Sequence, residues 1–268
     1  MIGRVWRRGA ILQVKSLKGG LEFRFPGQLT IQLYLGMPLV ATLLTYPLWR
    51  GFRADGLIAA VLVGIGAMLS VLAHELGHAA VAKRVGLKPS LIRLYALGGD
   101  VTWQAKHWTR AEEQRILWAG PLVNLLLGLV CLGAYWLLLQ APALLGIADP
   151  EHGRTVFLSP PPKFDPVPLR VLHWLGWINL VLGFLNLLPA YPLDGGRLAH
   201  NWIERRYGRA RALFWLGLSG TGLAILAKLA FVMSLLAGML IWAPPDFAPN
   251  WAAFKKGRRL LAAKPQGP

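Results

Sequence analysis

The sequence predicts an all-α polytopic membrane protein, with about six transmembrane helices and a short membrane-associated β-hairpin between helices two and three. Of the 268 residues, 55% are hydrophobic and only 15% are charged, whereas soluble globular domains contain about 25% charged residues. Long uncharged runs recur along the chain, and about 20 apolar residues are enough for a helix to cross a bilayer. So much apolar sequence excludes a disordered chain and argues against a soluble domain of this size.

The charges are strongly unbalanced, with 29 Lys and Arg against 12 Asp and Glu and a net charge of +17. A basic chain can indicate nucleic-acid binding, but nucleic-acid-binding proteins do not usually carry long uncharged runs. In a polytopic membrane protein, Lys and Arg collect in cytoplasmic loops. We therefore expect the lipid bilayer, and no nucleic acid, as a partner of this chain.

Six uncharged runs define the expected spans. The fifth and sixth runs are separated only by Lys228. One helix over both would hold about 35 residues and exceed about 50 Å, which is more than the bilayer core. We therefore expect two closely connected helices in residues 212–243, with one broken helix as the alternative. The six runs are 25–49, 56–73, 116–148, 171–193, 213–227 and 229–245.

Six spans would place most of the Lys and Arg residues on one side of the membrane. The basic side then holds the N-terminal arm, the segment between spans two and three, the stretch after span four and the tail. This asymmetry predicts a multi-pass protein of the cytoplasmic (inner) membrane with both termini in the cytoplasm. The expected organisation is a basic cytoplasmic arm (1–28), a transmembrane core (29–245) and a basic cytoplasmic tail (246–268).

The segment between spans two and three contains Gly98-Gly99-Asp100 between two β-prone runs. Turn-forming residues between two β-prone runs are typical of a β-hairpin. A plain surface turn is the alternative interpretation.

The end of the second span carries His74-Glu75-Leu76-Gly77-His78. Residues four apart share one helix face, so both imidazoles can bind one metal ion. Glu75 lies about 100° round the helix and can act on a water instead, which is the pattern of a zinc hydrolase. Ionisable groups inside a span cost several kcal/mol and indicate function by default, so we favour the metal site over a chance match.

A catalytic zinc usually has three protein ligands, and Asp194 is the best third candidate. It closes the fourth apolar run, after Pro189 and Pro192 and before Gly195 and Gly196. Prolines break the helix and glycines loosen the backbone, so a carboxylate can turn inward there. An N-cap Asp at the membrane edge is the alternative.

These residues resemble the site-2 protease family of intramembrane zinc metalloproteases, in its compact form without a PDZ or other appended soluble domain. The resemblance rests on His74–His78, on Ala119-Gly-Pro-Leu-Val-Asn124 and on Pro192-Leu-Asp194-Gly195, and it covers roughly residues 30–245. It implies that His74, His78 and Asp194 hold one Zn²⁺ per chain and that Glu75 is the general base. Tyr191 stands before Pro192, where many members of the family have Asn.

Three further residues are substrate-binding candidates. The amide of Asn124 can donate to the developing oxyanion, although a lone membrane Asn more often makes an interhelical hydrogen bond. Gly98 and Gly99 lie in the expected hairpin, whose exposed edge could hold an unwound substrate as an added strand. Asn179 and Asn186 in the fourth run are weaker candidates than Asn124.

The sequence thus predicts a zinc endopeptidase that acts by metal-activated water. The resemblance implies that it cleaves a single-span membrane protein in regulated intramembrane proteolysis. The alternative is a non-proteolytic membrane protein that binds or transports metal. A transporter is expected to show further ionisable groups along a path and an internal repeat, and the sequence shows neither. A catalytically silent relative would have no reason to keep Glu75. The sequence is compatible with a monomer and with a dimer.

Overall fold

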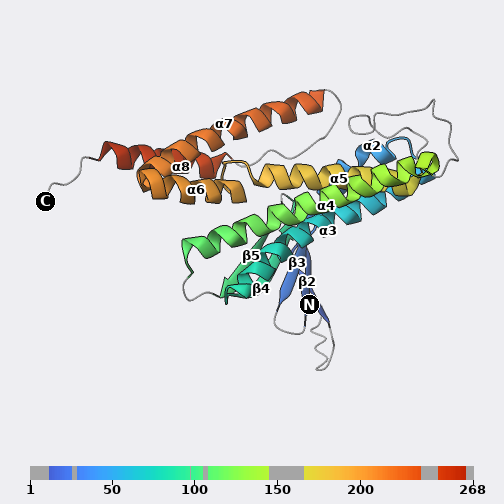
Figure 1. The fold of residues 1–268 in the computed structure, drawn as a ribbon, viewed down its shortest axis with the longest axis horizontal. Helices are drawn as coiled ribbons and strands as arrows, with labels where there is room; N and C mark the ends of the chain where they lie inside the picture. The colour runs from blue at the N-terminus through green and yellow to red at the C-terminus, as the bar shows by residue number, and fades with distance from the viewer. Residues whose placement is uncertain are drawn as a thin grey trace.

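The computed structural model describes residues 12–25, 29–96, 98–104, 108–144, 166–236 and 247–263. These residues form five strands and eight helices (Figure 1). The strands are β1 (Gln13–Leu17), β2 (Gly20–Arg24), β3 (Thr30–Tyr34), β4 (Lys88–Tyr95) and β5 (Gly98–Gln104). The helices are α1 (Gly36–Leu44), α2 (Tyr46–Trp49), α3 (Ala54–Arg84), α4 (Arg110–Leu144), α5 (Val167–Asn186), α6 (Asp194–Tyr207), α7 (Arg209–Leu236) and α8 (Ala248–Ala262).

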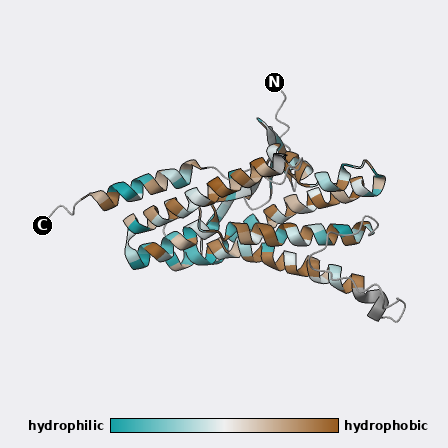
Figure 2. Cartoon of the chain, turned by 90° about the horizontal axis from the view of Figure 1, so that it is seen from above, coloured by the Kyte–Doolittle hydropathy of each residue, from teal (hydrophilic) through white to brown (hydrophobic). Residues whose placement is uncertain are grey.

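Four of the described helices, α3, α4, α5 and α7, are long and apolar enough to cross a membrane. Many of their large apolar side chains, such as Val61, Leu126 and Leu226, are exposed in the isolated chain, as lipid-facing residues must be. Hydrophilic residues gather at the end of the bundle that carries α6 and α8 (Figure 2). The chain is therefore a membrane protein with a mostly helical fold.

The first expected span, residues 25–49, is not one helix. It is divided between β3, α1 and α2, and α1 has only nine residues. Pro47 lies in the first turn of α2. In a continuous helix Pro47 could not donate a backbone hydrogen bond to Leu43, so the helix breaks at Thr45. The run is apolar because Met37 and Ala41 are buried, where α1 contacts α3.

The last two expected spans are joined within the described residues. α7 continues without a break through Lys228 to Leu236, so the prediction of two helices separated at Lys228 is wrong there. The exposed Lys228 ammonium lies 5.6 Å from the centre of the Phe247 ring, and such a cation–π contact makes the charge tolerable on an apolar helix. The remainder of the sixth run, residues 237–246, lies outside the described residues.

The predicted hairpin is present as the antiparallel pair β4 and β5. Tyr95 pairs with Gly98, so β5 already begins at Gly98, and Gly98-Gly99-Asp100 lies in the strand rather than at the turn. The hairpin belongs to a larger sheet of order β1-β2-β3-β4-β5, in which β3 and β4 are parallel. The fold is therefore not purely helical, because residues of the expected basic arm pair as β1 and β2.

The sheet packs against α3 through a small apolar core. Ile92 and Leu94 of β4 are buried with Met37 of α1 and Ala79 of α3. Ala79 directly follows His78, so the sheet lies beside the metal-binding motif (Figure 1). The domain boundaries after residues 28 and 245 stay predictions.

Candidate metal centre

The two histidines of the motif lie on one uninterrupted stretch of α3. Both His74 and His78 are buried, and their Nε2 atoms are 3.1 Å apart. One helical turn separates the two residues, so the helix places both side chains on one face. The sequence prediction that both imidazoles share a face is confirmed.

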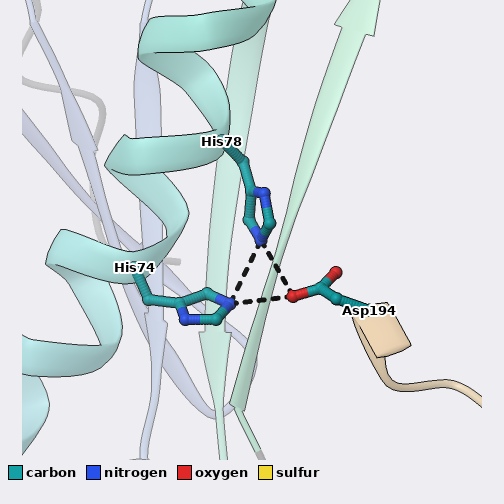
Figure 3. A group of neighbouring side chains, drawn as sticks. All are labelled: His74, His78 and Asp194. Carbon is teal, nitrogen blue, oxygen red and sulfur yellow. Dashed lines mark hydrogen bonds and ion pairs between the residues drawn. The ribbon is translucent and has the colours of Figure 1, made fainter. Parts of the chain in front are cut away.

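Asp194 is brought to the histidines by a different helix. It is the first residue of α6, and its Oδ2 lies 3.2 Å from Nε2 of both His74 and His78 (Figure 3). The N-cap of α6 is Leu193, and no side chain caps the helix. The alternative of a simple N-cap Asp is therefore wrong.

The three ligand atoms fit a tetrahedral zinc ion. They form a nearly equilateral triangle with sides of 3.1 Å and 3.2 Å. Zn–N bonds of about 2.0 Å in a tetrahedron require ligands about 3.3 Å apart. His78 Nδ1 donates to the carbonyl of Ile116 over 2.6 Å, which leaves Nε2 as the ligand atom. Within the part of the chain that the structure describes, His74, His78 and Asp194 are the cluster that could hold a metal ion.

Two glycines that the sequence analysis did not single out make room for this cluster. A Cβ atom on Gly120 of α4 would overlap Nε2 of His78 and come within 2.5 Å of Nε2 of His74. A Cβ on Gly77 would lie 3.0 Å from the carbonyl oxygen of Ala119. Small residues that face each other let membrane helices approach closely. The small residues in these two segments were therefore a sequence signal for close contact between α3 and α4.

A third residue that the sequence analysis missed, Glu113, links α6 to α4. Its carboxylate accepts hydrogen bonds from Arg197 Nη2 at 2.8 Å and from Asn201 Nδ2 at 3.0 Å. Arg197 lies one turn after Asp194 on α6. Glu113 therefore fixes the beginning of α6 relative to α4, the helix that also carries Gly120. The sequence signal that could have identified Glu113 is its position as an acidic residue at the start of an apolar helix.

The side chain of Tyr191, three residues before Asp194, also has a fixed partner. Its hydroxyl lies 2.7 Å from Nδ1 of His200. Burial raises the pKa of Tyr191 to about 12, and burial lowers the pKa of His200, so both groups are neutral near pH 7. Glu204 lies 3.8 Å from Nε2 of His200, which favours the proton on that nitrogen. The Tyr191 hydroxyl therefore donates to His200 Nδ1.

Glu75 is buried beside the edge strand β5. A Cβ on Gly99 would lie 2.7 Å from Cγ and 2.8 Å from Oε1 of Glu75, so only glycine leaves this space for the carboxylate. Gly98 has a φ of +139°, a backbone conformation that favours glycine. The two predicted glycines are thus brought to the motif, and β5 is an outer strand of the sheet.

The metal cluster, Glu75 and the two predicted glycines line one cavity of about 270 Å³. Its wall includes His74, Glu75, His78, Gly98, Gly99, Asn124, Asn186, Asp194 and Arg197. Asn124 is 1% exposed, and its Oδ1 has no hydrogen-bond partner among the described residues. Asn179 instead donates to Ser70 and to the carbonyl of Leu175. The interhelical role therefore belongs to Asn179, whereas Asn124 and Asn186 face the cavity.

Comparison with known proteins identifies the family. The model of peptidase family M50 matches residues 61–159 and 163–229, more than half of the chain. The Rip3 protein of Mycobacterium tuberculosis is 36% identical over 141 residues, which are 53% of this chain and 30% of Rip3. Zinc metalloprotease MJ0392 of Methanocaldococcus jannaschii is 33% identical over 167 residues, which are 62% of this chain and 42% of that protein. The chain thus spans less than half of the length of these relatives.

A solved structure shares the fold. The site-2 protease from Methanocaldococcus jannaschii superposes with a TM-score of 0.53 at 22% sequence identity, over 93% of this chain and 98% of that one. The family match includes His74, Glu75, His78, Asn124 and Asp194. The chain belongs to peptidase family M50, the family of the site-2 proteases that its motifs resemble.

Proposed function

We propose that this chain is an intramembrane zinc endopeptidase. The observation that carries the proposal is the convergence of His74, His78 and Asp194 within 3.2 Å, with Glu75 beside them in the same cavity. One zinc ion per chain, held by these three residues, would supply Lewis-acid activation of water and of the scissile carbonyl. Relatives that bear the name zinc metalloprotease support the choice of metal.

Three residues have distinct roles in the proposed reaction. Glu75 accepts a proton from the attacking water and delivers it to the leaving amine. The Asn124 amide, whose Oδ1 makes no hydrogen bond among the described residues, presents its Nδ2 to the developing oxyanion. The backbone at Gly98 and Gly99 pairs with an unwound substrate segment as an added strand. A Gly99→Ala change should lower cleavage with zinc retained, because the new methyl group displaces Glu75 rather than a ligand.

The substrate class we propose is a single-span membrane protein, cleaved in regulated proteolysis. The cavity lies between apolar helices, which supports a substrate delivered within the bilayer. We also propose that both termini lie on the cytoplasmic side of the inner membrane. The return of α8 along α7, shown by contacts of Gly217 with Phe254 and of Gly257 with Phe214, supports a C-terminus on the side where α7 begins.

The deciding experiment combines metal analysis with a cleavage assay. Purified protein in detergent is analysed for zinc by mass spectrometry and incubated with a panel of single-span substrates on gels. Glu75→Gln should keep zinc and lose cleavage by about 100-fold or more, whereas His74→Ala should lose both. Removal of zinc by a chelator should stop cleavage, and added zinc should restore it.

A matched control separates these effects from general damage. Glu112→Gln changes the same residue type at the start of α4, where Glu112 and Thr109 form a capping box that also accepts Gln. It should change neither zinc content nor cleavage. A wild-type protein that holds zinc but cleaves no substrate on the panel would instead support the non-proteolytic metal-binding function.

A further inference from the structure

We propose that Asn250, on the C-terminal helix α8, is a positioning residue that holds the metal-ligand loop in place. The ligand loop is the segment 187–193 between α5 and α6, which ends directly before Asp194. The inference rests on the proposed function, because it takes Asp194 to be a metal ligand. It concerns a helix outside the matched family region, which ends at residue 229.

Asn250 forms hydrogen bonds with both the N–H and the carbonyl of one loop residue. The Tyr191 N–H donates to Asn250 Oδ1 at 2.9 Å, and Asn250 Nδ2 donates to the Tyr191 carbonyl at 2.7 Å. Tyr191 lies three residues before Asp194. A paired set of hydrogen bonds to one residue fixes its orientation as well as its position, which a single bond or an apolar contact does not.

The site of Asn250 is built for this contact. Asn250 is 1% exposed, and a buried amide without partners would be costly. It is not the cap of its own helix, because the N-cap of α8 is Phe247, with no side-chain capping bond. A Cβ on Gly220 of α7 would overlap Asn250 Oδ1, so only glycine at position 220 lets the amide reach the loop.

The neighbouring helix supports the same segment. Ser219 of α7 donates its hydroxyl to the carbonyl of Pro189 at 3.1 Å, one residue along from Gly220. The Tyr191 hydroxyl is fixed separately by His200. The loop is thus held by α7 and α8 through its backbone and by α6 through a side chain, and Asn250 supplies two of these bonds.

The test measures metal affinity in two variants that break the same contact from opposite sides. Asn250→Ala removes the amide, and Gly220→Ala pushes it away from Tyr191. Each purified variant is titrated with Zn²⁺ in competition with a chelating dye, and its Co²⁺ form is recorded by visible absorption, which reports the ligand geometry. Both variants should bind Zn²⁺ about tenfold more weakly, the lower range for residues that orient metal ligands, with a changed Co²⁺ spectrum.

Two control variants separate positioning from general stability. Gly222→Ala adds the same methyl group on α7, where no atom lies within 4 Å of it, and should match the wild-type protein. Phe254→Ala removes an aromatic ring of α8 that packs against the ring of Phe214 on α7. It should lower the unfolding temperature and leave the Co²⁺ spectrum unchanged. If Asn250→Ala does not fold, Asn250→Asp keeps the size and the acceptor, loses the donor to the Tyr191 carbonyl, and should show a smaller change of the same sign.

The outcomes are distinguishable. Zinc affinity and a Co²⁺ spectrum that stay at wild-type values in folded Asn250 and Gly220 variants would overturn this inference and leave the proposed function intact. An equal loss of affinity in Phe254→Ala would also overturn it, because a general effect of α8 would then explain the data. A wild-type protein that binds no zinc would overturn the proposed function together with the inference.

Discussion

The histidine half and the aspartate half of the candidate centre are held in different ways. His74 and His78 are one turn apart on α3, so one helix places both imidazoles on the same face, with 3.1 Å between their Nε2 atoms. Asp194 lies after a break in the chain, and its place depends on contacts with Glu113 of α4 and with Tyr191, which α8 holds. The comparison teaches that local backbone geometry makes the first half robust, whereas distant packing makes the second half adjustable.

The largest expected effect tests whether the two halves are equally needed. His78→Ala and Asp194→Ala each leave two protein ligands where catalytic zinc usually has three. Both should weaken zinc binding by more than about 100-fold, the upper range for residues that only orient ligands. Equilibrium dialysis with zinc analysis measures this. Zinc retained at full affinity in Asp194→Ala would show that the aspartate half is not a ligand.

A smaller loss of zinc affinity is expected when a substitution disturbs His74 and His78 but leaves all three ligands in place. Gly120→Ala places a methyl group against both imidazoles, so zinc affinity should fall by about 10- to 100-fold. Gly133→Ala on the same helix meets no atom within 4 Å and serves as the matched control. Similar zinc affinity in both variants would mean that α4 can move away, and the histidine half would then be less rigid than the comparison states.

Zinc affinity should fall less when the contact that positions α6, and with it Asp194, is weakened. Glu113→Gln removes the charge that faces Arg197 but keeps a hydrogen-bond acceptor. Zinc affinity should therefore fall by only about 3- to 10-fold, near or below the lower range for outer residues. The same dialysis measures it, with Glu112→Gln as the control. A loss as large as that of Asp194→Ala would show that the whole of α6 detaches.

The smallest effect on the metal is expected far from both halves. At the start of α3, Asp55 pairs with Arg170 of α5 at 2.7 Å. Asp55→Asn leaves the mostly buried guanidinium without its charged partner, which destabilises the fold. The unfolding temperature in detergent should fall by a few degrees while zinc affinity stays unchanged. A fall in zinc affinity would mean that the far end of α3 is coupled to the motif.

The same contrast decides what the sequence could predict. The spacing of His74 and His78 and the break around Asp194 are local patterns, and both residues lie where they were expected. The β4–β5 hairpin was also predicted from local signals. The N-terminal strands were not, although Lys15 pairs with Glu22 and Val14 with Phe23 in an alternation typical of strands. Apolar content in residues 25–49 favoured a span and hid the strand β3.

Other features depend on contacts that no local pattern carries. The parallel pairing of β3 with β4 joins segments about 60 residues apart, with β-branched Ile31 opposite Ile92. Such pairing follows from the tertiary fold. The roles of Glu113, Gly120 and Asn250 also become visible only when their helices meet. The continuity of α7 through Lys228 was missed because the two runs together were too long for one span, and the single charge was taken as the boundary.

The short connection between β3 and α3 has a consequence for where the sheet sits. α1 and α2 run back along α3, as contacts of Gly64 with Ala41 and of Gly56 with Leu48 show. These two helices hold 13 residues, about 20 Å of helix, whereas the hydrocarbon layer is about 30 Å thick. This short connection holds the sheet alongside α3 rather than beyond its end, so the open backbone edge of β5 stays beside Glu75.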